Sequence, residues 1–164
     1  MRKKRPKSWE NAKESALRLL ALRDHSREEV RRKLRAKGFD REEIEEALQT
    51  LETRGILDDG RYAQRLAFYL AQEKLFGPQR ISQKLFQKGI PADLIQEAMG
   101  KAEGGLATNA RLRVVLGMKL KGRRLEQIFP NERRKLANYL RQRGFPWEDI
   151  QEAFQEAGGF TEKG

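Results

Sequence analysis

Apolar residues recur every three or four positions along most of this chain, with polar residues between them, which is typical of amphipathic α-helices. Val30 and Leu34 form one such stripe, and Ile44, Leu48 and Leu51 form the next. No segment alternates between apolar and polar residues over the length of a strand. The pattern therefore predicts an all-α protein.

One short phrase occurs three times, each time near the end of a predicted helix: a basic residue, a glycine, and then Phe or Ile. The copies contain Gly38, Gly89 and Gly144, which lie 51 and 55 residues apart. Each copy is followed at the same distance by an isoleucine and then a Glu-Ala pair. Self-similarity at this period is typical of one structural unit used in tandem.

Helix-capping residues divide the first unit into three helices. Asp24-His25 ends the first helix, which begins at Ser8. Ser26 with Glu29 forms a capping box that begins the second, and Asp40 with Glu43 begins the third.

The later units follow the same plan. In the second unit, Asp58 or Asp59 begins the first helix, Gly77-Pro78 the second and Pro91 the third. Gly100 and Gly104-Gly105 mark the boundary with the third unit, whose helices we expect at about 107–120, 131–143 and 146–157. The sequence thus predicts three tandem three-helix repeats at 8–55, 56–104 and 105–158, in an elongated array whose curvature it leaves open. Residues 1–7 are expected to be a disordered basic arm and 159–164 a flexible tail.

Composition fits an extended stack of helices better than one globule, since 38% of the 164 residues are apolar and 36% are charged. The absence of cysteine excludes disulfides and zinc–thiolate sites. No apolar run reaches the roughly 18 residues of a membrane helix, and the basic N-terminus leads into no signal segment. We therefore expect a soluble, cytoplasmic protein, monomeric and without a membrane partner.

The formal net charge of +11 favours a polyanionic partner, with nucleic acid as the first candidate. The charge is unevenly distributed, because the second helix of each unit is basic and the third helices of the first and last units are acidic. Residues 106–144 hold eleven basic and two acidic residues. A repeated basic helix predicts a stripe that follows a phosphate backbone or an acidic protein groove. The alternative is that these charges serve solubility or pair between units.

Candidate catalytic chemistry is sparse. His25 is the only histidine and is expected to be a linker residue. The Asp58-Asp59 pair suits helix capping better than metal binding, and no glycine loop is placed to hold a phosphate. We therefore expect no enzyme activity, no metal and no cofactor. The acidic third helices also argue against ordinary major-groove reading by a helix-turn-helix module.

Several short motifs of this sequence resemble those of the RecX family of bacterial recombination regulators. The most specific match is the string Gly-Ile-Leu-Asp-Asp-x-Arg-Tyr-Ala at 55–63. Further matches are Lys33-Leu34 with Lys37-Gly38-Phe39, Gly77-Pro78-x-Arg80-Ile81, and Lys88-Gly89-Ile90. The resemblance covers roughly residues 9–157 and is looser in the third unit.

The resemblance implies a non-enzymatic protein that binds the RecA filament on single-stranded DNA, with double-stranded DNA as a further ligand. Such proteins modulate, most often by inhibition, the ATPase and strand-exchange activities of RecA, in DNA recombination, repair and the SOS response. The sequence leaves two other hypotheses open: a largely sequence-independent DNA-binding protein, and a helical-repeat adaptor for another acidic protein.

The candidate contact residues come from two sources. The motifs that carry the resemblance favour Arg61, Tyr62, Arg80, Lys84 and Lys88. Charge on the first and third units adds Lys33, Lys37, Arg111, Arg113, Lys119, Arg123, Arg124, Lys135, Arg141 and Arg143.

Overall fold

The computed structural model describes residues 11–158, and all regular structure in that range is helical. The elements are α1 (Ala12–Leu22), α2 (Arg27–Lys37), α3 (Arg41–Thr53), α4 (Asp59–Gln72), α5 (Pro78–Gln87), α6 (Ala92–Ala102), α7 (Thr108–Leu120), the 3-10 helix η1 (Leu125–Gln127), α8 (Pro130–Gln142) and α9 (Trp147–Ala157). The predicted basic arm, the predicted tail and the predicted start of the first helix lie outside the described residues.

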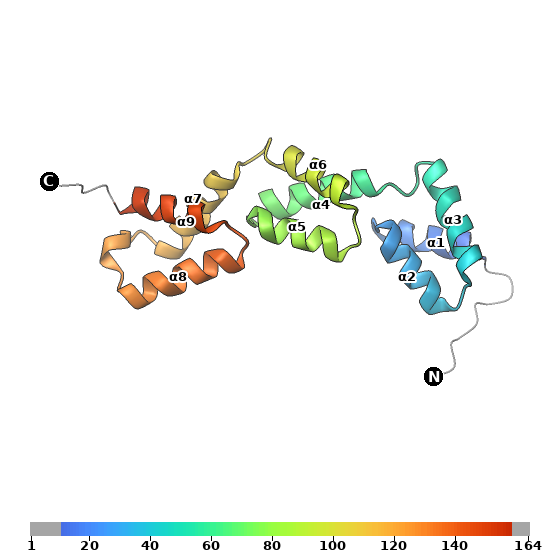
Figure 1. The fold of residues 1–164 in the computed structure, drawn as a ribbon, viewed down its shortest axis with the longest axis horizontal. Coiled ribbons are helices and arrows are strands. Elements are labelled where there is room, and N and C mark those ends of the chain that lie inside the picture. Colours follow the sequence, from blue (N-terminus) through green and yellow to red (C-terminus); the bar gives the residue numbers. More distant parts are fainter. Residues whose placement is uncertain (1–10, 159–164) are drawn as a thin grey trace.

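The helices form three units in a row: unit one is α1–α3, unit two is α4–α6, and unit three is α7–α9 with η1 (Figure 1). Each unit has its own hydrophobic core, centred for example on Leu34, Leu85 and Leu140. These three leucines are fully buried and occupy the same position of the repeat, four residues before the repeated glycine. The predicted tandem arrangement of three-helix repeats is therefore confirmed.

Local sequence explains most helix ends. The capping boxes at Ser26 and Asp40 both form, and the side chain of Asp58 accepts the backbone N–H of Arg61 to begin α4. One boundary signal was wrong: Gly100 lies inside α6, which continues to Ala102. A single glycine in a helix costs only about 1 kcal/mol, and α6 packs closely on α4 over this stretch.

The second helices α2, α5 and α8 follow one another along one edge of the row (Figure 1). The end of α5 meets the start of α2, and the end of α8 meets the start of α5. The backbone N–H of Gly77, at the start of α5, donates to the carbonyl of Arg143 at 2.9 Å, and Gln79 N–H donates to Gly144 at 3.1 Å. Likewise, the Ser26 hydroxyl at the start of α2 donates to the carbonyl of Lys88. These bonds satisfy backbone groups that helix ends otherwise leave unpaired.

We call the pairs Lys88-Gly89 and Arg143-Gly144 the glycine corners. Both glycines have positive φ, +75° and +91° respectively, which favours glycine because it lacks a Cβ. The space around these two positions also requires glycine. A Cβ on Gly144 would lie 2.2 Å from the backbone nitrogen of Arg80, and one on Gly89 would lie 2.5 Å from Cβ of Glu28. The repeated glycine therefore ends a helix and also allows two units to touch.

Replacing Gly144 with alanine should damage the contact between units two and three. We expect Gly144→Ala to lower the free energy of unfolding by about 1–3 kcal/mol more than Gly122→Ala, because the added methyl group collides with backbone. Gly122 is the matched control: its φ is +83°, but nothing lies within 4 Å of an added Cβ. Urea unfolding measures both, and small-angle X-ray scattering reports the length of the row. Equal losses in the two variants would contradict the steric role.

Candidate partner-binding surface

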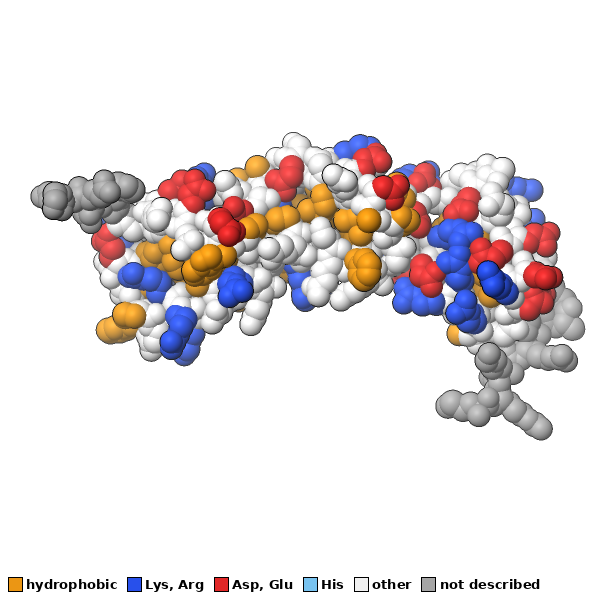
Figure 2. Space-filling model, viewed as in Figure 1, with side chains coloured by type: hydrophobic (Ala, Val, Ile, Leu, Met, Phe, Trp, Pro, Cys, Tyr) orange, Lys and Arg blue, Asp and Glu red, His pale blue; other side chains and the backbone are white. Residues whose placement is uncertain are grey.

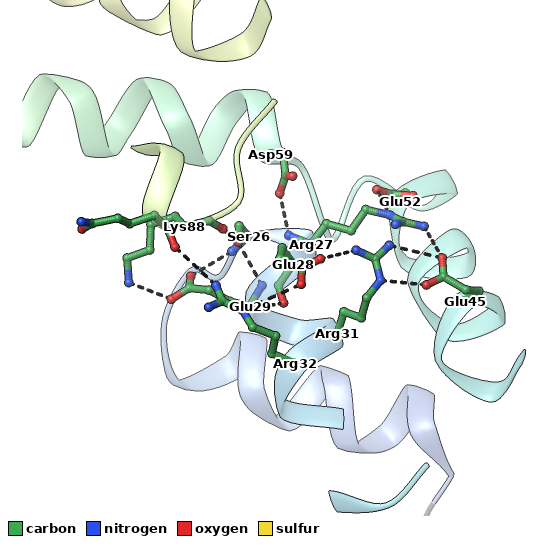
Figure 3. Close-up of polar contacts among 11 residues, drawn as sticks. Ser26, Arg27, Glu28, Glu29, Arg31, Arg32, Glu45, Glu52, Asp59 and Lys88 are labelled. Atoms are coloured by element: carbon green, nitrogen blue, oxygen red, sulfur yellow. Dashed lines mark hydrogen bonds and ion pairs between the residues drawn. The ribbon is translucent and has the colours of Figure 1, made fainter. Parts of the chain in front are cut away.

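Two cations of α2, Arg27 and Arg31, are neutralised inside unit one (Figure 3). Arg27 bonds Glu45 at 2.8 Å and Glu52 at 2.9 Å. Arg31 bonds the same Glu45 at 2.8 Å and also pairs with Glu28. The acidic third helix thus supplies partners for the first half of the basic second helix. Lys33 and Arg35, further along α2, are exposed and pair with no carboxylate of residues 11–158.

Glu29 is the centre of the junction between units one and two. Its carboxylate, almost buried, accepts from Lys88 Nζ at 2.8 Å, Arg23 at 3.1 Å, the Ser26 N–H at 3.1 Å and the Tyr62 hydroxyl at 3.2 Å. Burial opposes ionisation of this carboxyl, but the bonds from Arg23 and Lys88 outweigh it and hold the pKa at about 2. Burial, together with the neighbouring carboxylate, raises the pKa of Tyr62 to about 12. Lys88 and Tyr62 therefore join two units.

Asp59 completes this junction. Its carboxylate accepts the backbone N–H of Arg27 at 2.7 Å, so a residue of α4 caps the start of α2 from the neighbouring unit. Burial raises the pKa of this carboxyl. Among residues 11–158, no group of three or more His, Asp or Glu side chains is placed to hold a metal ion. The only histidine, His25, lies between α1 and α2 as expected, but it is buried, and burial lowers its pKa.

The junction between units two and three also uses cations. The guanidinium of Arg143 stacks 4.8 Å from the ring centroid of Phe76 and donates to the carbonyl of Leu75 at 3.3 Å. Arg111 is fully buried. It donates to the carbonyl of Phe76 at 3.2 Å and to the Glu103 carboxylate at 2.9 Å. Both arginines therefore link the units.

Other predicted contact residues have partners within a unit. Lys37 donates to the Ser15 hydroxyl, Arg61 to the carbonyl of Gly55 and Arg80 to Gln83. Lys84 and Lys119 lie over the rings of Phe76 and Tyr139, and Arg113 bonds Glu156 through two nitrogens. These side chains are at least partly exposed, so their contacts leave them accessible to a partner.

The least neutralised cations lie in unit three. Arg124, Lys135 and Arg141 are exposed and form no ion pair with a carboxylate of residues 11–158, and Arg123 reaches Glu132 only at 3.8 Å. Lys33 on α2 is also exposed. Figure 2 shows Lys and Arg among hydrophobic side chains over α8, whereas over unit one they are intermixed with Asp and Glu.

Sequence reasoning left Arg133, Arg134 and Trp147 out of the candidate residues. All three are exposed and border one groove between α8 and α9. The signal that could have found them is the loss, in the third copy of the repeat, of the acidic residues that pair with α2 in the first copy. No helix of the described part is long and apolar enough to span a membrane.

Family models match all three units. The first, second and third three-helix domains of RecX match residues 12–51, 58–99 and 114–154. The chain belongs to the RecX family.

Relatives named regulatory protein RecX resemble the chain over nearly its whole length. That of Chlorobaculum tepidum is 37% identical over 142 residues, which covers 87% of this chain and 85% of the relative. That of Halorhodospira halophila is 33% identical over 159 residues, which covers 94% of this chain and 93% of the relative. The crystal structure of RecX from Lactobacillus salivarius has the same fold, with a TM-score of 0.75, 24% identity, and coverage of 89% of this chain and 94% of that one. Membership of RecX identifies the chain as one of a family of regulatory proteins.

The charge of Glu29 should stabilise this RecX chain in a pH-dependent way. Because folding lowers the pKa of Glu29 from 4.5 to about 2, its contribution is complete above pH 4.5 and is lost as the pH falls towards 2. We expect Glu29→Gln to lower the free energy of unfolding by about 2 kcal/mol at neutral pH. The difference from the parent protein should shrink on acidification. Urea unfolding at several pH values measures this.

Glu97→Gln is the control, because Glu97 forms only exposed contacts, with Lys101 and Gln64, and its replacement should change stability little. A Glu29→Gln deficit that stays constant down to pH 2 would refute the proposed role of the charge.

Arg111 should matter for stability rather than for partner contact. Arg111→Met removes the donor to the carbonyls of Phe76 and Leu106 and leaves Glu103 with Thr108 alone, so we expect a loss of about 2–4 kcal/mol in the free energy of unfolding. Arg113→Met, two residues further along the same helix, removes an exposed pair and should have little effect. Thermal unfolding followed by circular dichroism compares them, and similar stabilities would contradict the assignment.

Proposed function

We propose that this chain is a non-enzymatic regulator that binds the RecA filament on single-stranded DNA and inhibits its ATPase and strand-exchange activities. Family membership supports a regulatory role, and the resemblance described above gives the partner. The observation that carries the proposal is the uneven use of cations along the row. Arg27 and Arg31 on α2 meet carboxylates within unit one, and Lys88 meets one across a junction. Arg124, Lys135 and Arg141 of unit three are exposed and pair with no carboxylate of residues 11–158.

The length of the row also suits a filament. A helix of 10–14 residues is about 15–20 Å long, and three units follow one another along a single direction (Figure 1). A filament presents the same protein surface and the same stretch of phosphates at regular intervals. An elongated ligand can therefore contact more than one protomer at once and restrain their movement relative to one another.

Direct binding to DNA without a recombinase is the second candidate. The same unpaired cations, Arg124 and Lys135 among them, favour it, because phosphate contacts of this kind need no base recognition. The two candidates differ in what they predict for naked single-stranded DNA. Binding to naked DNA that is as tight as binding to the filament, at the same salt concentration, would favour the second.

Loss of Arg123 and Arg124 should weaken binding to the filament. For Arg123→Gln with Arg124→Gln, we expect weaker inhibition of RecA ATPase on single-stranded DNA and an unchanged unfolding transition. If both side chains contact phosphates, the slope of log K against log salt should become shallower by about 1.4. ATPase assays and fluorescence anisotropy over a range of salt concentrations measure both effects.

The matched control is Arg41→Gln with Arg54→Gln, which removes two exposed charges at the two ends of α3 instead. Its inhibition should remain close to that of the parent protein. No effect of the parent protein on the ATPase at stoichiometric excess would refute the proposed function. Equal effects of the two double variants would remove unit three from the site.

A further inference from the structure

The groove between α8 and α9 combines an apolar floor with a cationic rim. It has a volume of about 600 Å³ and is bordered by Arg133, Arg134, Ala137, Arg141, Trp147 and Phe154. Trp147 is 45% exposed, a large value for so apolar a side chain. Figure 2 shows hydrophobic and basic side chains lying together over this part of unit three.

The first unit shows what fills the corresponding space elsewhere in the molecule. When Gly38 is matched with Gly144, Arg133 takes the place of Arg27 and Ala137 that of Arg31. In unit one, Arg27 and Arg31 both bond the carboxylate of Glu45 on the third helix at 2.8 Å (Figure 3).

Unit three lacks the carboxylate and one of the two arginines of this arrangement. The position of Glu45 is occupied by the neutral Gln151, and the long side chain of Arg31 is replaced by the methyl group of Ala137. Arg133 donates to the carbonyl of Leu125 at 3.0 Å, but neither it nor Arg134 nor Arg141 pairs with a carboxylate of residues 11–158. The third unit therefore keeps one of the two arginines and lacks the carboxylate that meets both in the first, and it has Arg134 where the first unit has Glu28.

We propose that the α8–α9 groove binds an acidic peptide segment of another protein. A carboxylate of that segment binds the rim arginines Arg133, Arg134 and Arg141, as Glu45 binds arginines in unit one. An adjacent apolar side chain packs on Trp147 and Phe154. This site does not depend on the proposed binding to a recombinase filament.

The shape and charge of the groove favour a peptide over nucleic acid. The cations lie on the α8 side only, since α9 contains four acidic residues and no basic one. A nucleic-acid strand carries a phosphate at every step, so its neighbouring phosphates would approach the acidic helix. A peptide can place one carboxylate at the arginines and an apolar side chain beside it, which matches one cationic wall and an apolar floor.

Tryptophan fluorescence can test the site directly. The chain has two tryptophans, so a Trp9→Phe background leaves Trp147 as the only reporter. The probes are a capped Asp-Glu-Phe-Glu-Asp peptide, its neutral Asn-Gln-Phe-Gln-Asn counterpart and an oligothymidylate. We expect the acidic peptide to shift the emission of Trp147 in a saturable way, and the neutral peptide to bind at least about tenfold more weakly.

Two variants separate charge from shape. Arg133→Gln with Arg141→Gln removes two of the three rim charges and should weaken binding of the acidic peptide by at least about tenfold. Ala137→Leu fills the groove without changing charge and should weaken it similarly. The control, Arg35→Gln with Arg41→Gln, changes exposed arginines at the unit-one positions that correspond to Arg141 and Trp147. It should bind like the parent protein, and circular dichroism confirms that each variant is folded.

The proposal is overturned if the acidic peptide gives no response up to about 1 mM, or if the rim variant binds it as well as the parent protein does. It is also overturned if the oligothymidylate binds more tightly than the peptide and loses affinity in the same variants, since the groove would then be a nucleic-acid site. None of these results depends on ATPase inhibition, so failure here and failure of the proposed function can be told apart.

Discussion

The contact between each glycine corner and the start of the preceding second helix is the constraint on which the arrangement of the row depends. The three hydrophobic cores are separate, so burial of apolar surface within a unit says little about how the next unit is placed. At the corner between units two and three, backbone meets backbone, because Gly77 and Gln79 donate directly to Arg143 and Gly144. At the corner between units one and two, the Ser26 hydroxyl donates to the carbonyl of Lys88. Such contacts tolerate no side chain at the glycine. They fix the direction of the chain and leave the outer faces of the helices free to vary.

The molecule uses its positive charge for two different purposes. Lys88, Arg111 and Arg143 hold units together, and each has partners in the neighbouring unit. The cations of α8 have lost their acidic counterparts and face outward. A high net charge alone does not distinguish these uses, because a buried arginine and an exposed one contribute equally to the total. The pairing of each cation decides whether it serves structure or recognition.

Much of the fold could be predicted from the sequence because its determinants are local. The capping boxes at Ser26 and Asp40 and the repeated glycines act within a few residues, and they placed the starts of α2 and α3 correctly. The first helix has no such signal at Ser8, where it was expected to begin, and α1 starts at Ala12 after the N-cap Asn11. Roles that depend on contacts between units could not be predicted. Nothing in the sequence around Arg111 shows that it is buried against the carbonyl of Phe76, or that Asp59 caps a helix of another unit. The groove beside Trp147 was not predicted because it arises where the third repeat has Gln151 and Ala137 in place of Glu45 and Arg31 of the first.

The residue that begins α8 limits how the row can grow. Phe129 is the N-cap of α8, as Ser26 is of α2 and Gly77 of α5, and its side chain is 74% exposed. Ser26 and Gly77 each lie twelve residues before their repeated glycine, whereas Phe129 lies fifteen before Gly144, so α8 is longer at its start by almost one turn. At Gly77, even a single added carbon would lie 2.3 Å from the backbone of the adjoining corner. The start of α8 therefore differs from the short start that receives a corner in α5. Adding a further module here by gene duplication would first require α8 to lose its extra turn and the phenyl ring that caps it.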